Sequence, residues 1–450
     1  MFRKLLIANR GEIACRVIRS ARKLGIETVA VYSDADQGAL HRYFADEAYR
    51  VGEGPSLKSY LNADIILDVA RKTGAGAIHP GYGFLSENAD FARRVRDAGL
   101  IWVGPSPEVI TLMGDKVRAR ETMSAAGVPV VPGTLSPVSP QQAMAEAERI
   151  GFPVLIKAVG GGGGIGMQVA EGPADLVKLV ESAAERARRA FGNGAVYLER
   201  YLERPRHVEV QVFGELDGTA HHIFERECSV QRRHQKVIEE TPSPLFLDGQ
   251  NAGVRTQLHE AAREAARAVG YVNAGTVEFL VDQKMGFFFL EMNTRLQVEH
   301  PVTELTTGLD LVEMQLRVAA GQPSGMDAAK LAQRGSAIEC RIYAEDPAKK
   351  FMPSPGLITV LAFPEGEGVR VDSGVQGGYT VSPFYDPMVA KISAWGRDRP
   401  EAIERICGAL EATRIQGIKH NIAMHLRILR SDAFRRGDLD TGALERGTFG

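Results

Sequence analysis

The first hundred residues alternate between short apolar runs and longer segments in which apolar positions recur every three or four residues. The short runs, rich in β-branched residues, predict buried strands, and the longer segments predict amphipathic helices. Predicted strands cover residues 4–8, 28–32, 77–79 and 101–103, and predicted helices cover residues 11–24, 63–72 and 87–98. This alternation indicates a parallel sheet with helices on both faces.

A second α/β segment begins after a Pro/Ser-rich connection at residues 132–140. Residues 151–157 predict a strand that ends at Lys157 and runs directly into five consecutive glycines. A helix over residues 174–191 and a strand over residues 195–201 follow, and the last quarter of the chain is β-rich. The pattern predicts a chain of α/β and α+β class with more than one domain.

Charged and amide side chains alternate with apolar ones between Glu291 and Glu299. In an extended strand successive side chains point to opposite faces, so one face would carry a polar row. That row consists of Glu291, Asn293, Arg295, Gln297 and Glu299. If buried, these side chains need cations and an anionic ligand as partners. We interpret the row as the floor of a site, and the alternative is a solvated strand face.

The segment before this row predicts a hairpin, because two apolar runs flank residues 283–286. A four-residue loop there places Glu278 opposite Glu291. A loop one residue longer places Glu278 opposite Leu290, and the sequence leaves both registers open. Two carboxylates that face each other across a ladder repel. Mg²⁺ would compensate them, since it binds one or two carboxylates together with substrate phosphates.

Five glycines at residues 160–164 disfavour regular structure and let backbone N–H groups approach phosphate oxygens. The loop lacks the lysine and hydroxyl residues of a Walker A motif. We interpret it as a mobile phosphate lid with Lys157 as a phosphate ligand at its base, and a flexible linker is the alternative. A second Gly/Pro-rich loop at residues 79–84 fits a ligand site and a structural turn equally well.

Residues 225–240 are too polar for an ordinary core element, and taken alone they indicate a solvated surface segment. Lone histidines such as His207 and His234 are more often structural than catalytic. Beside the acidic row, however, Arg233, Lys236 and the arginine of the row could hold phosphate or bicarbonate.

Composition describes an ordinary globular protein of 450 residues, long enough for about two to four domains. A net charge of −2 implies no bulk attraction to nucleic acid or membranes. The four cysteines show no zinc or redox spacing, and no apolar run reaches the length of a membrane span. A predicted strand begins too early for a signal peptide, so we expect a cytoplasmic protein with reduced thiols.

Several strings together resemble biotin carboxylases over essentially the whole chain. They are Ile7-Ala-Asn-Arg-Gly-Glu-Ile13, His79-Pro-Gly-Tyr-Gly-Phe-Leu-Ser-Glu-Asn88, Met113-Gly-Asp-Lys116, Lys157 with its glycines, Gln231-Arg-Arg-His-Gln-Lys236 and Glu291-Met-Asn-Thr-Arg-Leu-Gln-Val-Glu-His300. The resemblance implies an ATP-grasp fold. It places a Rossmann-like α/β domain at residues 1–112, an ATP-grasp domain at 113–334 with a mobile glycine-rich lid near 131–202, and a β-rich C-terminal domain at 335–446.

The resemblance also implies roles for individual side chains. ATP would be bound by Lys116, Lys157, Gly162, Gly163, Gly164, Gly166, Glu199, Leu202, His207, Gln231 and His234, with Glu199 and Leu202 at the adenine. Mg²⁺ or Mn²⁺ would be bound by Glu278, Glu291 and Asn293. Bicarbonate would lie against Arg295, Gln297 and the backbone of Val298, with Glu299 as the general base, Lys236 beside the developing carboxyphosphate, and Arg341 at the enolate of biotin.

The implied activity is the ATP- and bicarbonate-dependent carboxylation of biotin on a carrier protein, through carboxyphosphate. This is the first half-reaction of a biotin-dependent carboxylase. Acetyl-CoA carboxylase, with its role in fatty acid biosynthesis, is the preferred assignment over propionyl-CoA or pyruvate carboxylases. Partners would be a biotin carboxyl carrier protein, carboxyltransferase subunits and a second copy of the chain. The sequence has no Met-Lys-Met biotin attachment motif, so we expect a free-standing subunit or an isolated domain.

Three residues depart from the family pattern. Ile165 replaces a basic residue of the lid, and Lys23 and Glu367 replace an acid and an aromatic residue linked with the dimer contact. One alternative function is that of another ATP-grasp ligase, which joins an acyl phosphate to an amine. Such an enzyme would not need the combination of Arg295, Gln297, Glu299 and Arg341. A non-catalytic nucleotide-sensing subunit would lack the base or the metal ligands, which are present. A dehydrogenase is disfavoured because the glycines do not follow a first strand.

Overall fold

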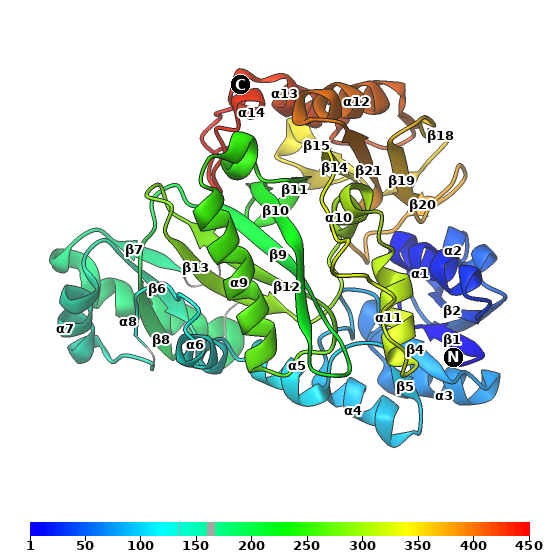
Figure 1. The fold of residues 1–450 in the computed structure, drawn as a ribbon, viewed down its shortest axis with the longest axis horizontal. Helices are drawn as coiled ribbons and strands as arrows, with labels where there is room; N and C mark the ends of the chain where they lie inside the picture. The colour runs from blue at the N-terminus through cyan, green and yellow to red at the C-terminus, as the bar shows by residue number, and fades with distance from the viewer. Residues whose placement is uncertain (135, 160–166) are drawn as a thin grey trace.

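The computed structural model describes residues 1–450 except 135 and 160–166 (Figure 1). Its N-terminal part is a five-stranded parallel sheet in the order β3-β2-β1-β4-β5. The elements are β1 (Lys4–Ile7), α1 (Gly11–Lys23), β2 (Glu27–Ser33), α2 (Leu40–Phe44), β3 (Glu47–Gly52), α3 (Ala63–Thr73), β4 (Ala77–His79), α4 (Ala89–Asp97) and β5 (Ile101–Trp102). The predicted elements are confirmed with small shifts at their ends. The edge strand β3 and the short α2 were not predicted, because polar residues break the pattern there.

Alternate residues of β1 enter two different cores. Leu5 and Ile7 pack with residues of α1, whereas Leu6 packs with residues of α3 and α4. Helices therefore cover both faces of the sheet, and the loops after parallel neighbours β1 and β4 meet at one edge. There Asn9 Nδ2 donates hydrogen bonds to the carbonyls of Pro80 (2.6 Å) and Tyr82 (2.8 Å).

A single eight-stranded antiparallel sheet forms the centre of the molecule. Its order is β13 (Phe287–Asn293), β12 (Asn273–Val281), β9 (Arg206–Gly214), β10 (Ala220–Arg232), β11 (Gln235–Thr241), β14 (Ser336–Tyr343), β21 (Met388–Gly396) and β19 (Val369–Ser373). Helix α9 (Ala252–Ala268) covers β9 and β10, and α12 (Arg399–Ala412) packs on β14 and β21 (Figure 1). The β11–β14 pairing joins the two halves of the sheet.

A smaller three-stranded sheet stands apart from the central sheet (Figure 1). It consists of β7 (Gln168–Ala170), β6 (Val154–Ala158) and β8 (Val196–Arg200), backed by α7 (Pro140–Ile150) and α8 (Pro173–Phe191). These elements bury their own apolar cluster, which includes Ile156 and Leu198. The glycines expected to form a phosphate lid lie outside the described residues, and the mobility of the lid stays a prediction.

Smaller elements connect and complete these parts. They are α5 (Pro107–Gly114), α6 (Lys116–Ala125), α10 (His300–Thr307), α11 (Leu311–Ala319), β15 (Glu345–Asp346), β16 (Met352–Pro353), β17 (Gly356–Leu357), β18 (Val360–Ala362), β20 (Thr380–Val381), β22 (Arg414–Gln416), α13 (Ile422–Arg430) and α14 (Asp432–Arg436). Within the described part of the chain, no helix has the length and apolar character needed to cross a membrane.

The composition of residues 225–240, taken alone, indicated a solvated surface segment, and this is wrong. This segment forms the β10–β11 hairpin in the middle of the central sheet. Most of its charges are paired inside the protein: Arg226 Nε donates to Glu209 Oε1 (2.6 Å), and Glu240 accepts from Arg399 (2.6 Å). Arg233 and His234, at the turn of the hairpin, are exposed. A polar strand is stable in a core when each charge finds such a partner, and a single sequence does not show those partners.

The β12–β13 hairpin places Glu278 opposite Glu291, which is one of the two pairings that the sequence left open. The turn pairs Val281 with Phe287, which is the longer-loop register that would have set Glu278 against Leu290. A register shift between Phe279 and Glu278 leaves Leu290 as an extra residue and restores the carboxylate pair. Such a bulge is typical of strands beside functional sites, where it redirects side chains.

The extended polar row was predicted to continue to Glu299, and this is wrong beyond Asn293. Strand β13 ends there, residues 294–299 are irregular, and Glu299 immediately precedes α10. The polar side chains nevertheless converge, because Gln297 of the irregular segment contacts Glu278 of β12 and Arg295 contacts Asn293 of β13.

Candidate active site

One lysine lies at the centre of three carboxylates from different strands and loops. Lys236 Nζ is 2.9 Å from Glu278 Oε1 and 2.7 Å from Glu299 Oε1, and it also contacts Glu209. Burial opposes a charged ammonium, but the carboxylates outweigh it and raise the pKa of Lys236 well above its usual value. Each carboxylate has a second basic partner, since Arg226 contacts Glu209, Arg341 contacts Glu299 and His207 Nε2 lies 3.0 Å from Glu278 Oε2. The neighbouring Glu291 has no such partner among the described residues, which leaves it for a further cation.

Glu278 and Glu291 provide the place for such a cation. Burial, and then the charge of Glu278, raises the pKa of Glu291. Among the described residues, no basic side chain lies within ion-pair distance of Glu291. Asn293 Nδ2 donates to Glu278 Oε1 (2.9 Å). Two facing carboxylates with an amide oxygen nearby are hard oxygen ligands of the kind that Mg²⁺ prefers, so the predicted metal residues fit the ion.

Two further predicted residues hold the irregular segment in place. Arg295 donates to Gln297 Oε1 (2.9 Å) and to Asn293 Oδ1 (3.2 Å), and Gln297 Nε2 donates to Glu278 Oε1 (3.1 Å). Glu87, which sequence reasoning missed as a partner, accepts from Arg295 Nε at 2.8 Å. The arrangement leaves a guanidinium, an amide and the backbone of Val298 beside Glu299.

Glu299 connects Lys236 to Arg341. The carboxylate is fully buried, and its Oε2 lies 3.0 Å from Arg341 Nη2. Burial alone would raise the pKa of Glu299, yet Lys236 and Arg341 outweigh it and hold that pKa well below its usual range. Arg341 also donates to Glu239 at 2.6 Å, a partner that sequence reasoning did not identify. Glu299 is therefore an ionised acceptor between two cations.

A cavity of about 440 Å³ opens between the small sheet and the central sheet. Its walls contain the predicted nucleotide residues Lys157, Glu199, Leu202, His207, Gln231 and His234. Lys157 Nζ donates to Glu199 Oε2 (2.9 Å), and Arg120, which was not predicted, contacts the same carboxylate. Lys116 lines an adjacent cavity of about 240 Å³ together with Glu291 and Asn293. Gly162, Gly163, Gly164 and Gly166 lie outside the described residues.

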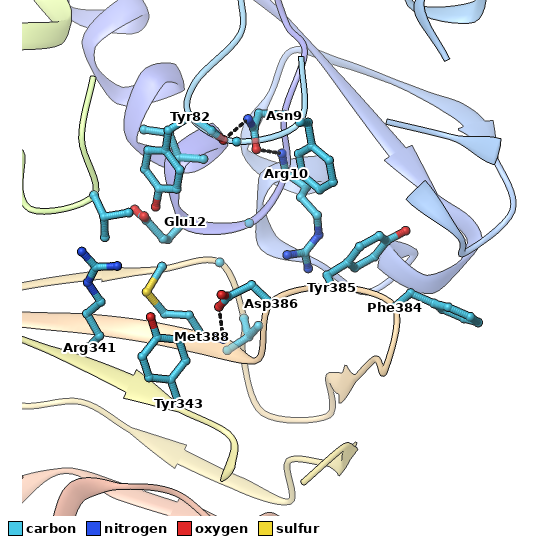
Figure 2. Close-up of a pocket in the computed structure, with 17 residues that line it drawn as sticks. Asn9, Arg10, Glu12, Tyr82, Arg341, Tyr343, Phe384, Tyr385, Asp386 and Met388 are labelled. Carbon is cyan, nitrogen blue, oxygen red and sulfur yellow. Dashed lines mark hydrogen bonds between the residues drawn. The ribbon is translucent and has the colours of Figure 1, made fainter. Parts of the chain in front are cut away.

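A second large cavity, of about 410 Å³, lies between the N-terminal sheet and the C-terminal strands (Figure 2). Glu12, Tyr82 and Arg341 gather at one side of it, while Arg10 and Tyr385 stand at the other (Figure 2). The Gly/Pro-rich loop at residues 79–84 contributes Tyr82, Gly83 and Phe84 to the wall. Arg341 thus faces this cavity and touches Glu299 at the same time. Sequence reasoning did not single out Glu12 or Tyr385, which follow no catalytic motif.

The class of protein is an ATP-grasp enzyme. Its features are the central antiparallel sheet, the smaller three-stranded sheet and the cluster of Lys236 with its carboxylates. Residues 115–325 match the family model described as "Carbamoyl-phosphate synthase L chain, ATP binding domain". Residues 1–110 and 339–446 match the N-terminal and C-terminal domains of biotin carboxylase. The chain belongs to the biotin carboxylase family.

Relatives of known sequence cover almost the whole chain. Biotin carboxylase 2 of Bacillus subtilis is 52% identical over 447 residues, which are 99% of this chain and 100% of that protein. The biotin carboxylase of Haemophilus influenzae is 51% identical over 448 residues, which are 99% of this chain and 99% of that protein.

Solved structures are similar over the same span. The biotin carboxylase domain dimer of Hydrogenobacter thermophilus 2-oxoglutarate carboxylase, in complex with MgADP, ADP and bicarbonate, has a TM-score of 0.94 at 45% identity and covers 100% of this chain and 99% of its own. The Campylobacter jejuni biotin carboxylase–beta-gamma-ATP complex has a TM-score of 0.94 at 44% identity, with 99% of both chains covered.

Proposed function

We propose that this chain is an ATP-dependent ligase that carboxylates biotin with bicarbonate through a carboxyphosphate intermediate. The observation that carries the proposal is the position of Glu299. It contacts Lys236, which also contacts the proposed metal ligand Glu278, and Arg341, which lines the second cavity. A base in that position can take part both in the activation of bicarbonate and in the carboxylation of biotin.

We infer that bicarbonate binds against Arg295, Gln297 and the backbone of Val298, with Glu299 as its base. Bicarbonate is a weak nucleophile, so removal of its proton and stabilisation of the charge on the phosphate both accelerate attack. Lys236 and Mg²⁺, held by Glu278 and Glu291, would supply the charge stabilisation. The low pKa of Glu299 in the free protein keeps the carboxylate ready to accept a proton. Phosphate oxygens that engage Lys236 would release Glu299 from its ion pair and make it more basic.

ATP would occupy the 440 Å³ cavity with Glu199 and Leu202 near its base. Lys157, Lys116, His207, Gln231 and His234 would contact the phosphates and ribose, and the glycines at 160–164 would close over them. Carboxyphosphate hydrolyses readily, so closure would protect it by excluding water.

Biotin would enter the second cavity, where Arg341 stabilises the negative charge that develops on the ureido oxygen. This assignment follows from the position of Arg341 in the wall of that cavity and beside Glu299. Bringing carboxyphosphate, or the CO₂ it releases, next to the ureido nitrogen is mainly a matter of positioning.

We further propose acetyl-CoA as the final acceptor, within fatty acid biosynthesis, with a carrier protein and carboxyltransferase subunits as partners. We also propose a homodimer, since one structural relative is a dimer. The contact would involve Lys23 and Glu367, and the exposed Lys23 lies 3.2 Å from Asp310 in the free chain. The domain boundaries near residues 112 and 334 belong to the same proposal.

The proposal is tested by ADP release with bicarbonate, with and without biotin. The wild type should respond to both, and Glu299→Gln should lower the biotin-dependent rate by about 100-fold or more, because Gln cannot accept the proton. Glu240→Gln is the matched control, a buried carboxylate that binds Arg399 away from both cavities. ADP release indifferent to biotin would instead indicate another ATP-grasp ligase.

A further inference from the structure

Two fully buried glutamates face each other directly behind Arg341. Glu239 on β11 and Glu339 on β14 are paired residues of the antiparallel ladder, and neither is exposed. Arg341 Nε donates to Glu239 Oε1 (2.6 Å), and Ser393 Oγ donates to Glu339 Oε2 (2.8 Å). The other oxygens, Glu239 Oε2 and Glu339 Oε1, have no hydrogen-bond partner among the described residues.

The surrounding charges do not compensate two carboxylates at this place. The charged or titratable groups near the pair come from several elements. They are Lys236 on β11, Cys228 on β10, Glu299 before α10, Cys340, Arg341 and Tyr343 on β14, and Lys391 on β21. Lys236 is already shared by three carboxylates, and Lys391 lies 3.4 Å from Glu12. Arg341 divides its guanidinium between Glu239 and Glu299. His300 of α10, close by, is held neutral because burial and then Lys391 lower its pKa.

Two charged carboxylates on directly paired residues of a ladder and away from water repel strongly. Burial, partly offset by Arg341, raises the pKa of Glu239 to about 7, and burial, partly offset by Lys391, raises the pKa of Glu339 to about 8. A pair of this kind holds one proton at neutral pH, and its titration belongs to both residues together.

We propose that Glu239 and Glu339 share one proton through a carboxyl–carboxylate hydrogen bond and act as a positioning pair for Arg341. The proton comes from solvent and stays on the pair: the Glu339 hydroxyl donates to Glu239 Oε2, which satisfies both unpartnered oxygens. The pair then presents one negative charge to Arg341. That single negative charge holds the guanidinium in the cavity wall, whereas two negative charges would overcompensate its positive charge.

The consequence for catalysis rests on the proposed function. Loss of the shared proton above about pH 8 adds a second negative charge behind Arg341. The guanidinium is then less able to stabilise negative charge on the biotin oxygen, so the biotin-dependent rate declines on the alkaline side. A purely structural pair would not impose this decline.

Infrared spectroscopy tests the shared proton without any assay of activity. Between about pH 6 and pH 9, the wild type should lose a protonated-carboxyl C=O band, and Glu339→Gln should lack that component. Glu240→Gln, which replaces a carboxylate hydrogen-bonded to Arg399, should retain it. Glu12, whose pKa burial raises to about 7, contributes equally to all three proteins. A spectrum of Glu339→Gln identical to the wild type would overturn the proposal.

The pH profile tests the positioning role. The ratio of biotin-dependent to biotin-independent ADP release should fall above about pH 8 in the wild type, whereas Glu339→Gln should lack this fall because its amide carries no titrating proton. Glu239→Gln should lower kcat/KM for biotin by about ten-fold at every pH, because Arg341 loses its anchor. Superimposable profiles of wild type and Glu339→Gln would refute the role. No response of the wild type to biotin would refute the proposed function, while the infrared result would still decide the shared proton.

Discussion

At the scale of single residues, the site depends on charged side chains that burial destabilises and that specific partners stabilise. Arg226 is fully buried and hydrogen-bonded to Glu209, Gln211 and Thr303. Such networks contribute little net stability as pairs, but removal of one member leaves a charge unpaired. The same logic makes the ionisation of each carboxylate depend on its neighbours, and this gives the protein a measurable dependence on pH.

Glu339 makes the stability of the fold decrease toward alkaline pH. Its pKa is raised in the folded state to about 8, so between the ordinary glutamate pKa and about pH 8 the folded protein binds a proton that the unfolded chain has released. The free energy of unfolding therefore falls as pH rises through this range. Glu339→Gln should flatten the decline in melting temperature between about pH 6 and pH 9. An unchanged slope would contradict the assignment, and Glu240→Gln should keep the wild-type slope.

At the scale of elements, the bulge in β13 determines which side chains reach the nucleotide cavity. Leu290 is the extra residue, and it lines both the 440 Å³ cavity and the smaller cavity that contains Lys116. The bulge thus supplies an apolar surface for the nucleotide while Glu291 stays opposite Glu278.

Leu290→Ala should weaken nucleotide binding more than it slows catalysis. Loss of apolar contact of about 1–2 kcal/mol predicts a KM for ATP raised about five- to thirty-fold, with kcat changed far less. Steady-state kinetics at saturating bicarbonate measure both constants. The exposed Leu216 offers a control, since Leu216→Ala should change neither. A lowered kcat with an unchanged KM would show that Leu290 supports the chemistry instead.

Sequence patterns predicted the parallel sheet and its helices, because the apolar period of each element is local information. They offered two registers for the hairpin, of which one sets Glu278 opposite Glu291. They did not predict the bulge at Leu290, the end of the strand at Asn293 or the burial of residues 225–240. Those features depend on partners distant in sequence, such as Arg399 for Glu240. The pairing of Glu239 with Glu339 was missed for the same reason, since 100 residues separate them along the chain.

At the scale of the whole molecule, the second cavity lies where tyrosines of the C-terminal part contact a buried ion pair of the N-terminal part. Arg10 donates to both oxygens of Asp36 (2.6 and 2.7 Å), and Tyr379 from the C-terminal part donates to Asp36 Oδ1 (2.8 Å). Arg10 also lies over the ring of Tyr385, 4.5 Å from its centroid. These contacts position the walls that face each other in Figure 2.

Asp36→Asn should loosen this junction. Breaking a buried ion pair while its partner stays in place costs about 3–5 kcal/mol, so unfolding by denaturant should begin at lower concentration and the KM for biotin should rise. Asp34→Asn is the matched control, because Asp34 forms an exposed pair with Arg50 that contributes about 1 kcal/mol or less. Equal effects of the two substitutions would argue against a fastening role for Asp36.

The central claim is that one continuous site couples the use of ATP and bicarbonate to the carboxylation of biotin, with Glu299 and Arg341 at the point of coupling. Transfer of labelled carbon from bicarbonate to biotin, measured together with ADP release, tests it most directly. The wild type should form labelled carboxybiotin as it releases ADP. In Arg341→Met, the rate at which label enters biotin should fall by at least about ten-fold, while bicarbonate-dependent ADP release persists. Absence of label in biotin with the wild type, or equal labelling by Arg341→Met, would contradict the account.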